Sequence, residues 1–438
     1  MAWQVNKHRN PLTGQTIAGS APERRLSITG SILPVGWNRR RSMCLLVLLL
    51  VAGQSGAQTP DPRFELVESI PVETALDNPL IRNTTEVWLE LIRAARKTID
   101  IEQFYVANQP GEALETIIRE LEQANRRGVT IRLIADARMA QTYPETLDRL
   151  SRQPLIDVHK TPFFNRRGGV QHAKLLIVDR QTVFIGSPNF DWRALDHIHE
   201  IGLKIIHPEL AQLLTAMFEA DWNQSYPATR TAAEASGQWF KMQLTGGETV
   251  RFYLTGSPAD LLPAGMRWDE TAIVELIDSA KQQISIQLLS YSPLQRKTYY
   301  ARLDQALRRA ATRGVSVHLL VSDWCQRPDE IPYLKSLAVW PGISVKLSTI
   351  PQWSGGYISY SRVEHCKYMI VDDQMVWLGT SNWKRDYFYD SRNVALVVQS
   401  HTLNQLLRQV FAKSWDGEYS WLVRPEATYT PKFYGENP

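Results

Sequence analysis

Hydrophobic patterns typical of helices and of strands alternate along most of the chain, and the same order of patterns occurs in two parts of it. In residues 112–127 apolar residues recur at intervals of three and four, as in a helix with one buried face, and after Gly128 residues 129–135 have the composition of a buried strand. The same order returns in residues 303–313 and 315–321. Strands separated by helical stretches predict a largely parallel or mixed sheet with helices packed on its faces.

One short pattern of residues is written twice at a constant spacing. Its members are His172, Lys174, Asp179, Gly186, Ser187 and Asn189, which recur 193 residues later as His365, Lys367, Asp372, Gly379, Thr380 and Asn382. Residues 98–106 likewise resemble residues 283–291. A long repeat of this kind indicates a duplicated structural unit. We therefore predict an α/β fold of two similar lobes, residues 58–238 and 239–438, which are related by an approximate twofold axis and hold the active site at their interface.

The first 57 residues have the layout of a leader with an export signal. Arg39, Arg40 and Arg41 precede an apolar run, residues 43–53, and small residues follow up to Ala57. An apolar run of this length rises about 16 Å as a helix, whereas the hydrocarbon core of a bilayer is about 30 Å thick. We therefore predict cleavage after Ala57 and an exported protein, periplasmic or secreted, without a permanent membrane span. An uncleaved signal anchor is the alternative, and the true start codon stays open.

The formal net charge of +4 comes from the leader. Residues 1–57 contain seven Lys and Arg and one acid, so the remainder has 42 Lys and Arg against 44 Asp and Glu, a net charge of −2. A broadly basic surface for nucleic acid is therefore not predicted. With 44% hydrophobic residues and only three cysteines, the chain is neither disordered nor a disulfide scaffold. Whether Cys325 and Cys366 form a bridge stays open.

The repeated pattern places reactive side chains on one surface. Residues 170–177, like their counterparts in the second copy, are a predicted strand, in which residues two apart project from the same face. His172 and Lys174 therefore share a face. Asp179 lies an odd number of residues from His172, in a predicted hairpin turn. We assign Asp179 and its counterpart Asp372 to structural work, holding the turn or a neighbouring base.

The strand after each turn ends in a hydroxyl and an amide residue. Because a hairpin brings its end back to the level of its start, we expect Ser187 and Asn189, and likewise Thr380 and Asn382, to contact substrate beside a His/Lys pair. Such a set suits a phosphodiester: ammonium and amide groups hold the nonbridging oxygens, one imidazole attacks phosphorus and the other moves protons. The scheme requires no metal or other cofactor, and the acidic clusters typical of a magnesium or calcium site do not accompany the motif.

The duplicated HxKxxxxD motif with its following G(S/T)xN resembles the signature of the phospholipase D superfamily. Within this superfamily, five segments of the chain resemble the animal lysosomal phospholipase D-like 5′ exonucleases. They are residues 64–71, 186–202, 321–330, 360–371 and 379–388. The resemblance implies two lobes around one active site and a phosphohistidine intermediate. It also implies hydrolysis of single-stranded DNA or RNA from the 5′ end, often by a homodimer.

The resemblance further implies roles for single residues. The nucleophile and the general acid/base fall on His172 and His365. The residues implied in phosphate binding are Lys174, Lys367, Asn189 and Asn382. Glu200 matches the acidic residue that orients a catalytic imidazole in the family, but the equivalent residue of the second copy is Asn393, which carries no charge. The two histidines are therefore not expected to be equivalent. Family habit favours His172 as the nucleophile, and which imidazole Glu200 supports stays open.

Aromatic and basic residues close to the motifs are candidates for substrate contacts. Tyr105, Trp192 and Trp383 would stack on bases, a sequence-tolerant way to bind single strands. For Trp192 and Trp383, packing beneath the motif loops is the competing interpretation. Arg362, just before the second motif, is a candidate for a substrate phosphate.

Two other functions fit parts of the sequence. A phospholipase D or phosphatidyltransferase would use the same intermediate on a phospholipid and would need exposed apolar loops. The residues available for such loops are Leu261, Leu262, Pro263, Trp340 and Pro341. A binding module with decayed chemistry is disfavoured because every motif side chain is present in both copies. The sequence thus favours a metal-independent phosphodiesterase that acts on single-stranded nucleic acid.

Overall fold

The computed structural model describes residues 61–226, 237–295 and 298–435 of the chain, all within the unit that begins at Ala57. The predicted leader, residues 1–57, lies outside the described residues. Among the helices of the described ranges, none is both long enough and apolar enough to cross a bilayer. Cys325 and Cys366 are buried free thiols, so they do not form a bridge with each other.

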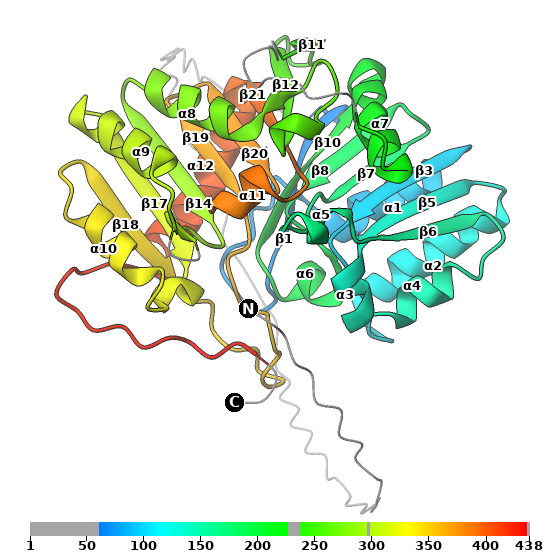
Figure 1. Ribbon diagram of the computed structural model, residues 1–438, viewed down its shortest axis with the longest axis horizontal. Coiled ribbons are helices and arrows are strands. Elements are labelled where there is room, and N and C mark those ends of the chain that lie inside the picture. Colours follow the sequence, from blue (N-terminus) through cyan, green and yellow to red (C-terminus); the bar gives the residue numbers. More distant parts are fainter. Residues whose placement is uncertain (1–60, 227–236, 296–297, 436–438) are drawn as a thin grey trace, which may run out of the picture. The chain divides into compact units, whose positions relative to one another are not determined.

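The first half, residues 61–226, is built on an eight-stranded mixed sheet (Figure 1). The strand order is β2-β1-β10-β8-β7-β3-β5-β6, in which β3, β5 and β6 run parallel while β7, β8, β10 and β1 pair antiparallel. The strands are β1 (Phe64–Ser69), β2 (Arg82–Asn83), β3 (Thr98–Gln103), β5 (Thr130–Asp136), β6 (Ile156–Thr161), β7 (Leu175–Val178), β8 (Thr182–Gly186) and β10 (Glu200–Ile206). A separate short pair consists of β4 (Val106–Ala107) and β9 (Phe190–Asp191).

The second half, residues 237–435, contains a ten-stranded sheet. Its order is β11-β12-β21-β20-β19-β14-β17-β18-β22, with β13 paired to β12. The strands are β11 (Phe240–Gln243), β12 (Thr249–Ser257), β13 (Arg267–Trp268), β14 (Gln283–Leu288), β17 (Ser316–Ser322), β18 (Ile343–Ser348), β19 (Tyr368–Val371), β20 (Met375–Gly379), β21 (Asn393–Gln399) and β22 (Ser420–Leu422). A separate short antiparallel pair consists of β15 (Leu294–Gln295) and β16 (Thr298–Tyr299).

The two sheets have the same topology. The order β13-β12-β21-β20-β19-β14-β17-β18 repeats the whole first sheet strand by strand, and β11 and β22 are additions at the two edges. The prediction of a mixed α/β fold with two similar halves is therefore confirmed. The halves contact each other where β8 meets β20 and β21. The boundary between residues 238 and 239 stays a prediction.

Helices flank the sheets (Figure 1). In the first half they are α1 (Thr84–Ala94), α2 (Ala113–Arg126), α3 (Ala137–Thr142), α4 (Glu145–Leu150), α5 (Phe163–Arg166), α6 (Trp192–Asp196) and α7 (Pro208–Asn223). In the second half they are α8 (Asp269–Ser279), α9 (Arg302–Thr312), α10 (Ile331–Ala338), α11 (Arg385–Tyr389) and α12 (His401–Asp416), with short 3₁₀ turns η2 (Ala259–Leu261) and η3 (Asp323–Gln326). The predicted helices 112–127 and 303–313 correspond to α2 and α9 within one residue at each end.

Alternating residues of β7 divide the core of the first half into two layers. Leu175 and Ile177 belong to the apolar cluster that contains α7 and continues into the second half. Leu176 and Val178 belong to the cluster formed with α1, α2 and α4. This alternation is the period of two that a strand buried on both faces produces. The strand and the residues before it are thereby fixed from both sides.

The motif strands are shorter than the sequence indicated. Residues 170–177 were a predicted strand, but β7 begins only at Leu175, so His172 and Lys174 lie in the extended segment before it. The reason is that residues 170–172 form their main-chain bonds with the other half, through a parallel bridge between Gln171 and Arg392, and only the Lys174 carbonyl accepts from β8 of its own sheet. The second motif differs in the same way, since β19 begins at Tyr368.

Candidate active site

Main-chain hydrogen bonds between the halves bring both motif histidines to one place. The His172 N–H donates to the carbonyl of Arg392 at 2.9 Å, and the Arg392 N–H returns a bond to the first motif segment. In the second motif the His365 N–H donates to the carbonyl of His199, also at 2.9 Å. Each motif segment therefore pairs, in parallel, with the residues that directly precede β21 or β10 of the other half.

Each imidazole takes its Nδ1 partner from the other half. Nδ1 of His365 lies 2.8 Å from both carboxylate oxygens of Glu200, and Nδ1 of His172 lies 3.0 Å from Oδ1 of Asn393. Glu200 opens β10 and Asn393 opens β21, so the two partners occupy equivalent places in the fold. The structure thus places Glu200 beside His365, a pairing that the sequence left open.

The amide of Asn393 has a fixed orientation. Its Nδ2 donates to the carbonyl of Tyr387 at 2.7 Å and lies 3.3 Å from the hydroxyl of Ser257, while its Oδ1 accepts from the hydroxyl of Thr380 at 2.9 Å. Oδ1 therefore faces the ring of His172, and an acceptor at this place requires the proton on Nδ1. The Nε2 atom of His172 then carries the lone pair that a nucleophile needs.

Both motif lysines are fully buried. Nζ of Lys174 donates to the carbonyl of His172 at 2.7 Å, and Nζ of Lys367 donates to the carbonyl of His365 at 2.5 Å. Burial lowers the pKa of Lys367 to about 7, although Glu200 opposes the shift. Burial also lowers the pKa of Lys174 well below its usual value, and the charge of Lys367 lowers it further. A phosphate bound here would supply the counter-charge that both ammonium groups lack.

The two imidazoles share one electrostatic environment. His172 is 3% exposed and His365 is 8% exposed. Burial lowers the pKa of both rings well below the usual value, and the charges of Lys174 and Lys367 act on both rings in the same direction. Coulombic effects weaken with distance, so the action of both lysines on both rings agrees with the main-chain bonds in indicating that the four side chains lie near one another.

Glu200 differs from an ordinary surface carboxyl. Burial raises its pKa to about 8, and the charge of Lys367 opposes the shift. At neutral pH the Glu200–His365 pair therefore retains a proton. The Nδ1 partner of His172 is the neutral amide of Asn393, which cannot hold a proton for this ring in the same way.

The motif amides have unsatisfied ends in the site. Oδ1 of Asn189 and Oδ1 of Asn382 are buried and have no hydrogen-bond partner among the described residues. Nδ2 of Asn189 lies 3.5 Å from the hydroxyl of Tyr105, at the limit of a hydrogen bond. A half-turn of either amide would place an N–H where Oδ1 now lies, and donation to a phosphate oxygen stays a prediction.

The motif hydroxyls bond to the neighbouring strand. The Ser187 hydroxyl accepts from the Ile201 N–H at 2.9 Å and donates to the Ile201 carbonyl at 3.2 Å. The Thr380 hydroxyl accepts from the Val394 N–H at 3.1 Å and donates to Asn393. Both hydroxyls thus hold β10 and β21 in place, and a contact of either with substrate stays a prediction.

The motif aspartates anchor the turn to the strand beside it. Each has a positive φ, 52° at Asp179 and 49° at Asp372. The carboxylate of Asp179 accepts the main-chain N–H groups of Arg96, Lys97 and Thr98 at 2.8, 2.7 and 2.9 Å. That of Asp372 accepts those of Lys281, Gln282 and Gln283 at 2.9, 2.8 and 3.0 Å. Each aspartate therefore fixes the start of β3 or β14, the strand that pairs with its motif strand.

The predicted aromatic contacts differ in exposure. Tyr105 and Trp192 are half-buried, and the Tyr105 hydroxyl donates to Asp191 at 2.8 Å. Trp383 is only 1% exposed and packs edge-on against Trp377 with ring centroids 6.1 Å apart. Trp383 is therefore a core residue beneath the motif loop, as the packing interpretation describes. Stacking by Tyr105 and Trp192 stays a prediction.

Arg362 is engaged by main-chain carbonyls. Its Nε donates to Pro351 at 2.6 Å and its Nη1 donates to Val72 at 2.8 Å. Its side chain therefore ties the loop before the second motif to the first half. A contact with substrate phosphate would have to use the remaining amino group, Nη2, and stays a prediction.

Sequence reasoning missed two buried ionic groups that join the halves. Arg392 forms a two-pronged ion pair with Asp221, at 2.7 and 2.6 Å. His199 lies between Glu364, 2.6 Å from Nδ1, and Glu68, 2.8 Å from Nε2. The partners lie 131 to 171 residues apart in the chain, and no motif or spacing marks them.

The His199 group also brings potential metal-ligand atoms close together. Among the residues that the structure describes, His199, Glu364 and Cys366 are the one group of three whose ligand atoms lie within 4.8 Å of one another. Against the effect of burial, the two carboxylates raise the pKa of His199 to about 10. Both ring nitrogens thus donate N–H bonds, which suits an imidazolium and not a neutral ligand.

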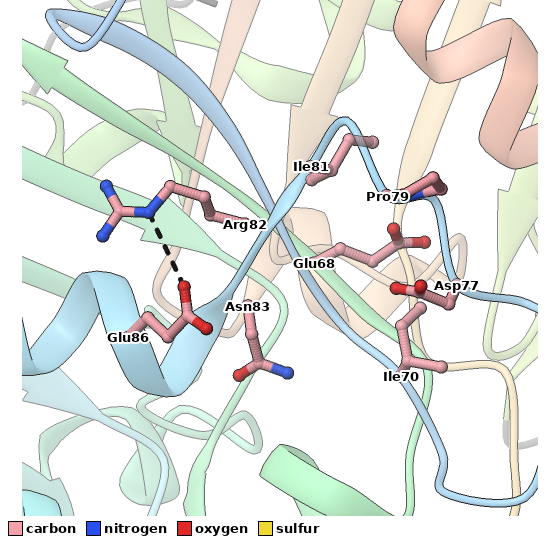
Figure 2. A pocket seen from close by; sticks show the side chains of 8 residues that line it. All are labelled: Glu68, Ile70, Asp77, Pro79, Ile81, Arg82, Asn83 and Glu86. Carbon is pink, nitrogen blue, oxygen red and sulfur yellow. Dashed lines mark ion pairs between the residues drawn. The ribbon is translucent and has the colours of Figure 1, made fainter.

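A cavity of about 270 Å³ opens beside the same group. It is lined by Glu68, Ile70, Asp77, Pro79, Ile81, Arg82, Asn83 and Glu86, none of which belongs to the motifs. Figure 2 shows the carboxylates of Glu68 and Asp77 pointing towards each other, whereas Arg82 turns to Glu86, 3.7 Å away. The cavity is therefore acidic and does not suit a phosphate.

Comparisons with known proteins agree with this geometry. The family model described as "Cardiolipin synthase, PLD-like domain" matches residues 88–222 and 273–415, one match in each half. The 5'-3' exonuclease PLD3 of Xenopus laevis is 33% identical over 401 residues, which cover 82% of this chain and 80% of that protein. Phospholipase D Z of Dictyostelium discoideum is 28% identical over 399 residues, 84% of this chain and 91% of that protein.

A solved structure supports the fold alone. Phosphatidylserine synthase of Haemophilus influenzae aligns with a TM-score of 0.54 at 16% identity, over 77% of this chain and 85% of that one. At this identity the likeness shows the fold of the chain and does not indicate its substrate.

Proposed function

The chain belongs to the phospholipase D-like family and is a phosphodiesterase of that superfamily, and on this premise we propose that it hydrolyses single-stranded nucleic acid through a phosphohistidine intermediate without a metal ion. The observation that carries the proposal is the pair of imidazoles in one site, each held at Nδ1 by the other half. Buried ammonium and amide groups beside them supply the positive charge and the donors that a phosphodiester needs.

In the first step Nε2 of His172 attacks phosphorus. A P–N bond forms as the P–O bond to the leaving group breaks, and the departing oxygen takes the proton from Nε2 of His365. As that proton leaves, the proton held by Glu200 moves onto Nδ1 of His365, so the imidazole remains neutral. Lys174 and Lys367 neutralise the charge that grows on the nonbridging oxygens.

In the second step water replaces the enzyme on phosphorus. Nε2 of His365 takes a proton from the incoming water, the new P–O bond forms and the P–N bond to His172 breaks. The proton returns His365 and Glu200 to their starting state. The same side chain thus acts as acid and then as base, as reversibility requires.

The assignment of His172 as nucleophile rests on what lies behind each ring. Burial and the charges of Lys174 and Lys367 lower the pKa of His172, and the neutral amide of Asn393 directs its lone pair to Nε2. The Glu200–His365 pair, in contrast, holds a proton that can be donated. Were the roles reversed, the leaving group would have to be protonated by a ring without a proton reservoir.

Nucleic acid is favoured as substrate by the Xenopus laevis relative, whose name is 5'-3' exonuclease and which this chain matches over most of its length. The runner-up is a phospholipase D or phosphatidyltransferase, supported by the name of the Dictyostelium discoideum relative. The apolar residues that a lipid-binding loop would use differ in their exposure. Leu261 and Leu262 are 6% and 3% exposed, whereas Trp340 is 38% exposed. The loop around η2 therefore contributes to the core.

Export by the leader to the periplasm or outside the cell, and a homodimer, are part of the same proposal. They rest on the sequence of residues 1–57 and on the resemblance described above.

The test is a side-by-side incubation in EDTA of labelled single-stranded DNA with a 5′ hydroxyl and of phosphatidylcholine vesicles, from pH 4 to 8. We expect stepwise shortening of the oligonucleotide and intact lipid. Choline release with an uncut oligonucleotide would establish the lipid enzyme in its place. Activity that appears only when a divalent ion is added would refute the metal-independent mechanism.

A further inference from the structure

Two aromatic rings flank the imidazole of His172. The centroid of the Phe104 ring lies 5.2 Å from that of the imidazole, and the Tyr387 ring meets it edge-on at 4.9 Å. Nζ of Lys174 lies 5.5 Å from the centroid of the Phe104 ring. Both rings therefore lie within one side chain's reach of the atoms that would hold the scissile phosphate.

The second motif has no such rings at the equivalent places. Phe104 directly follows β3 and its carbonyl accepts from the Asp136 N–H, and Leu289 directly follows β14 and its carbonyl accepts from the Ser322 N–H. Tyr387 is the third residue of α11, and the third residue of α6 is Ala194. Since the backbones correspond, the aromatic surface is a property of the His172 side alone.

These rings are also the accessible part of the site. His172, Lys174 and Asn189 are buried, whereas Phe104 and Tyr387 are half-buried and keep part of their surface open. A flat, apolar group of the substrate would find its partner there. In a nucleic acid that group is the base.

On the basis of the proposed function, we propose that Phe104 and Tyr387 form a stacking surface for the base of the nucleoside that stays attached to the phosphate on His172. The leaving strand then departs on the side of His365, where Leu289 and Ala194 offer no ring. The surface favours unpaired strands, because a base in a duplex must first be released from its pairing partner and its stacked neighbour before it can lie on the rings.

The competing explanation is that the two rings only hold the imidazole in place, and the two explanations differ in their dependence on the base. We would compare Phe104→Leu, which introduces the residue of the second half, with the wild type on two oligonucleotides. One carries a terminal base and the other is abasic at that nucleotide. Phe433→Leu, the same change at a ring that is 50% exposed, is the matched control.

We expect kcat/KM of the wild type to be at least about tenfold higher with the base than without it, from the usual strength of base stacking. Phe104→Leu should lose about tenfold on the base-bearing strand and less than about twofold on the abasic one. Phe104→Tyr, which keeps the ring, should restore the preference, and Phe433→Leu should match the wild type on both strands.

An equal loss of Phe104→Leu on both strands, or a wild type indifferent to the base, would overturn the stacking surface and leave the nuclease assignment intact. Failure of the wild type to cut either strand, together with choline release from vesicles, would overturn the nuclease assignment itself. Because the preference of the wild type is measured without any variant, the outcome does not depend on the folding of Phe104→Leu.

Discussion

Both carboxylate oxygens of Glu200 lie 2.8 Å from Nδ1 of His365, so a residue of the first half controls the protonation of an imidazole in the second. The equivalent partner of His172 is the uncharged Asn393, 3.0 Å away. The two rings are similarly buried and share the same lysines, and they differ mainly in the charge behind them. Replacements on the two sides should therefore have different chemical effects.

Glu200→Gln should slow reactions that need a proton on the leaving group. The amide cannot supply a proton to His365, and loss of general acid catalysis costs about 10²- to 10⁴-fold in rate. We expect a loss in that range for an oligonucleotide but a much smaller one for a nitrophenyl phosphodiester, because nitrophenolate leaves without protonation. Equal losses on both substrates, measured as kcat, would mean that Glu200 has a different role.

His172→Asn and His365→Asn should each abolish steady-state turnover of oligonucleotides without unfolding the protein. With a nitrophenyl diester, however, His365→Asn should release one equivalent of nitrophenolate and retain the phosphoryl group, because His172 still attacks while the base that activates water is missing. Intact-protein mass spectrometry should detect the acid-labile adduct. An adduct in His172→Asn and none in His365→Asn would reverse the assigned roles.

Activity should fall at alkaline pH. The proton for the leaving group resides in the Glu200–His365 pair, and burial raises the pKa of Glu200 to about 8. In the substrate complex the bound phosphate keeps Lys174 and Lys367 protonated, so the proton of the Glu200–His365 pair sets the alkaline limb of kcat. The active form is fully populated below this value and is lost as the pH rises through it, so kcat for an oligonucleotide should decline about tenfold per pH unit above about 8. Glu200→Gln should lack this limb. A wild-type profile that is flat from pH 7 to 10 would contradict the pair as proton donor.

Asp372→Ala should destabilise the fold. Although burial acts in the opposite direction, main-chain N–H donors from residues 281–283 hold the pKa of Asp372 below its usual value. Removal of the carboxylate leaves these donors unpaired, and we expect a loss of about 2–3 kcal/mol in the free energy of unfolding. The exposed neighbour Asp373 provides the control, since Asp373→Ala should change the unfolding midpoint very little.

The same carboxylate predicts a pH dependence of stability. A group whose folded pKa is depressed contributes stability above its unfolded pKa, about 3.9, and that contribution is lost as the pH falls through the folded value. Urea unfolding should therefore show a smaller difference between wild type and Asp372→Ala at pH 3 than at pH 7. A difference that grows on acidification would rule out this origin.

Asp221→Asn should destabilise the fold more than the loss of a partly exposed charge does. It would leave the guanidinium of Arg392, which is 0% exposed, without its two-pronged partner, and breaking a buried pair in this way costs about 3–5 kcal/mol. Glu219→Gln, on the same helix but at a partly exposed ion pair with Arg132, should cost no more than about 1 kcal/mol. Thermal unfolding of both variants checks the contrast, and equal effects would mean that Arg392 finds another partner.

The repeat made the fold and the membership of the site predictable. Since His172 and His365 recur with the same companions, two similar halves and a shared site follow from the sequence. The sequence did not predict that each imidazole takes its Nδ1 partner from the other half. Glu200 stands 28 residues after His172 yet contacts His365, because the motif segments leave their own sheets and pair across the halves.

Side-chain environments were the other limit. Arg362 is basic and adjacent to the second motif, but its guanidinium is drawn to the carbonyls of Pro351 and Val72. Trp383 occupies a position that also suits stacking, yet it lies in the core. The choice between such environments depends on which loop comes from a distant part of the chain, and a local pattern does not record that.

Because each motif imidazole takes its Nδ1 partner from the other half, the enzyme needs both halves to complete its site. A polypeptide with one copy of the motif could complete its two imidazoles only by meeting a second molecule, and its activity would vanish on dilution. Here a covalent connection turns that encounter into an intramolecular one. Turnover per molecule should therefore be independent of protein concentration, whatever further self-association occurs.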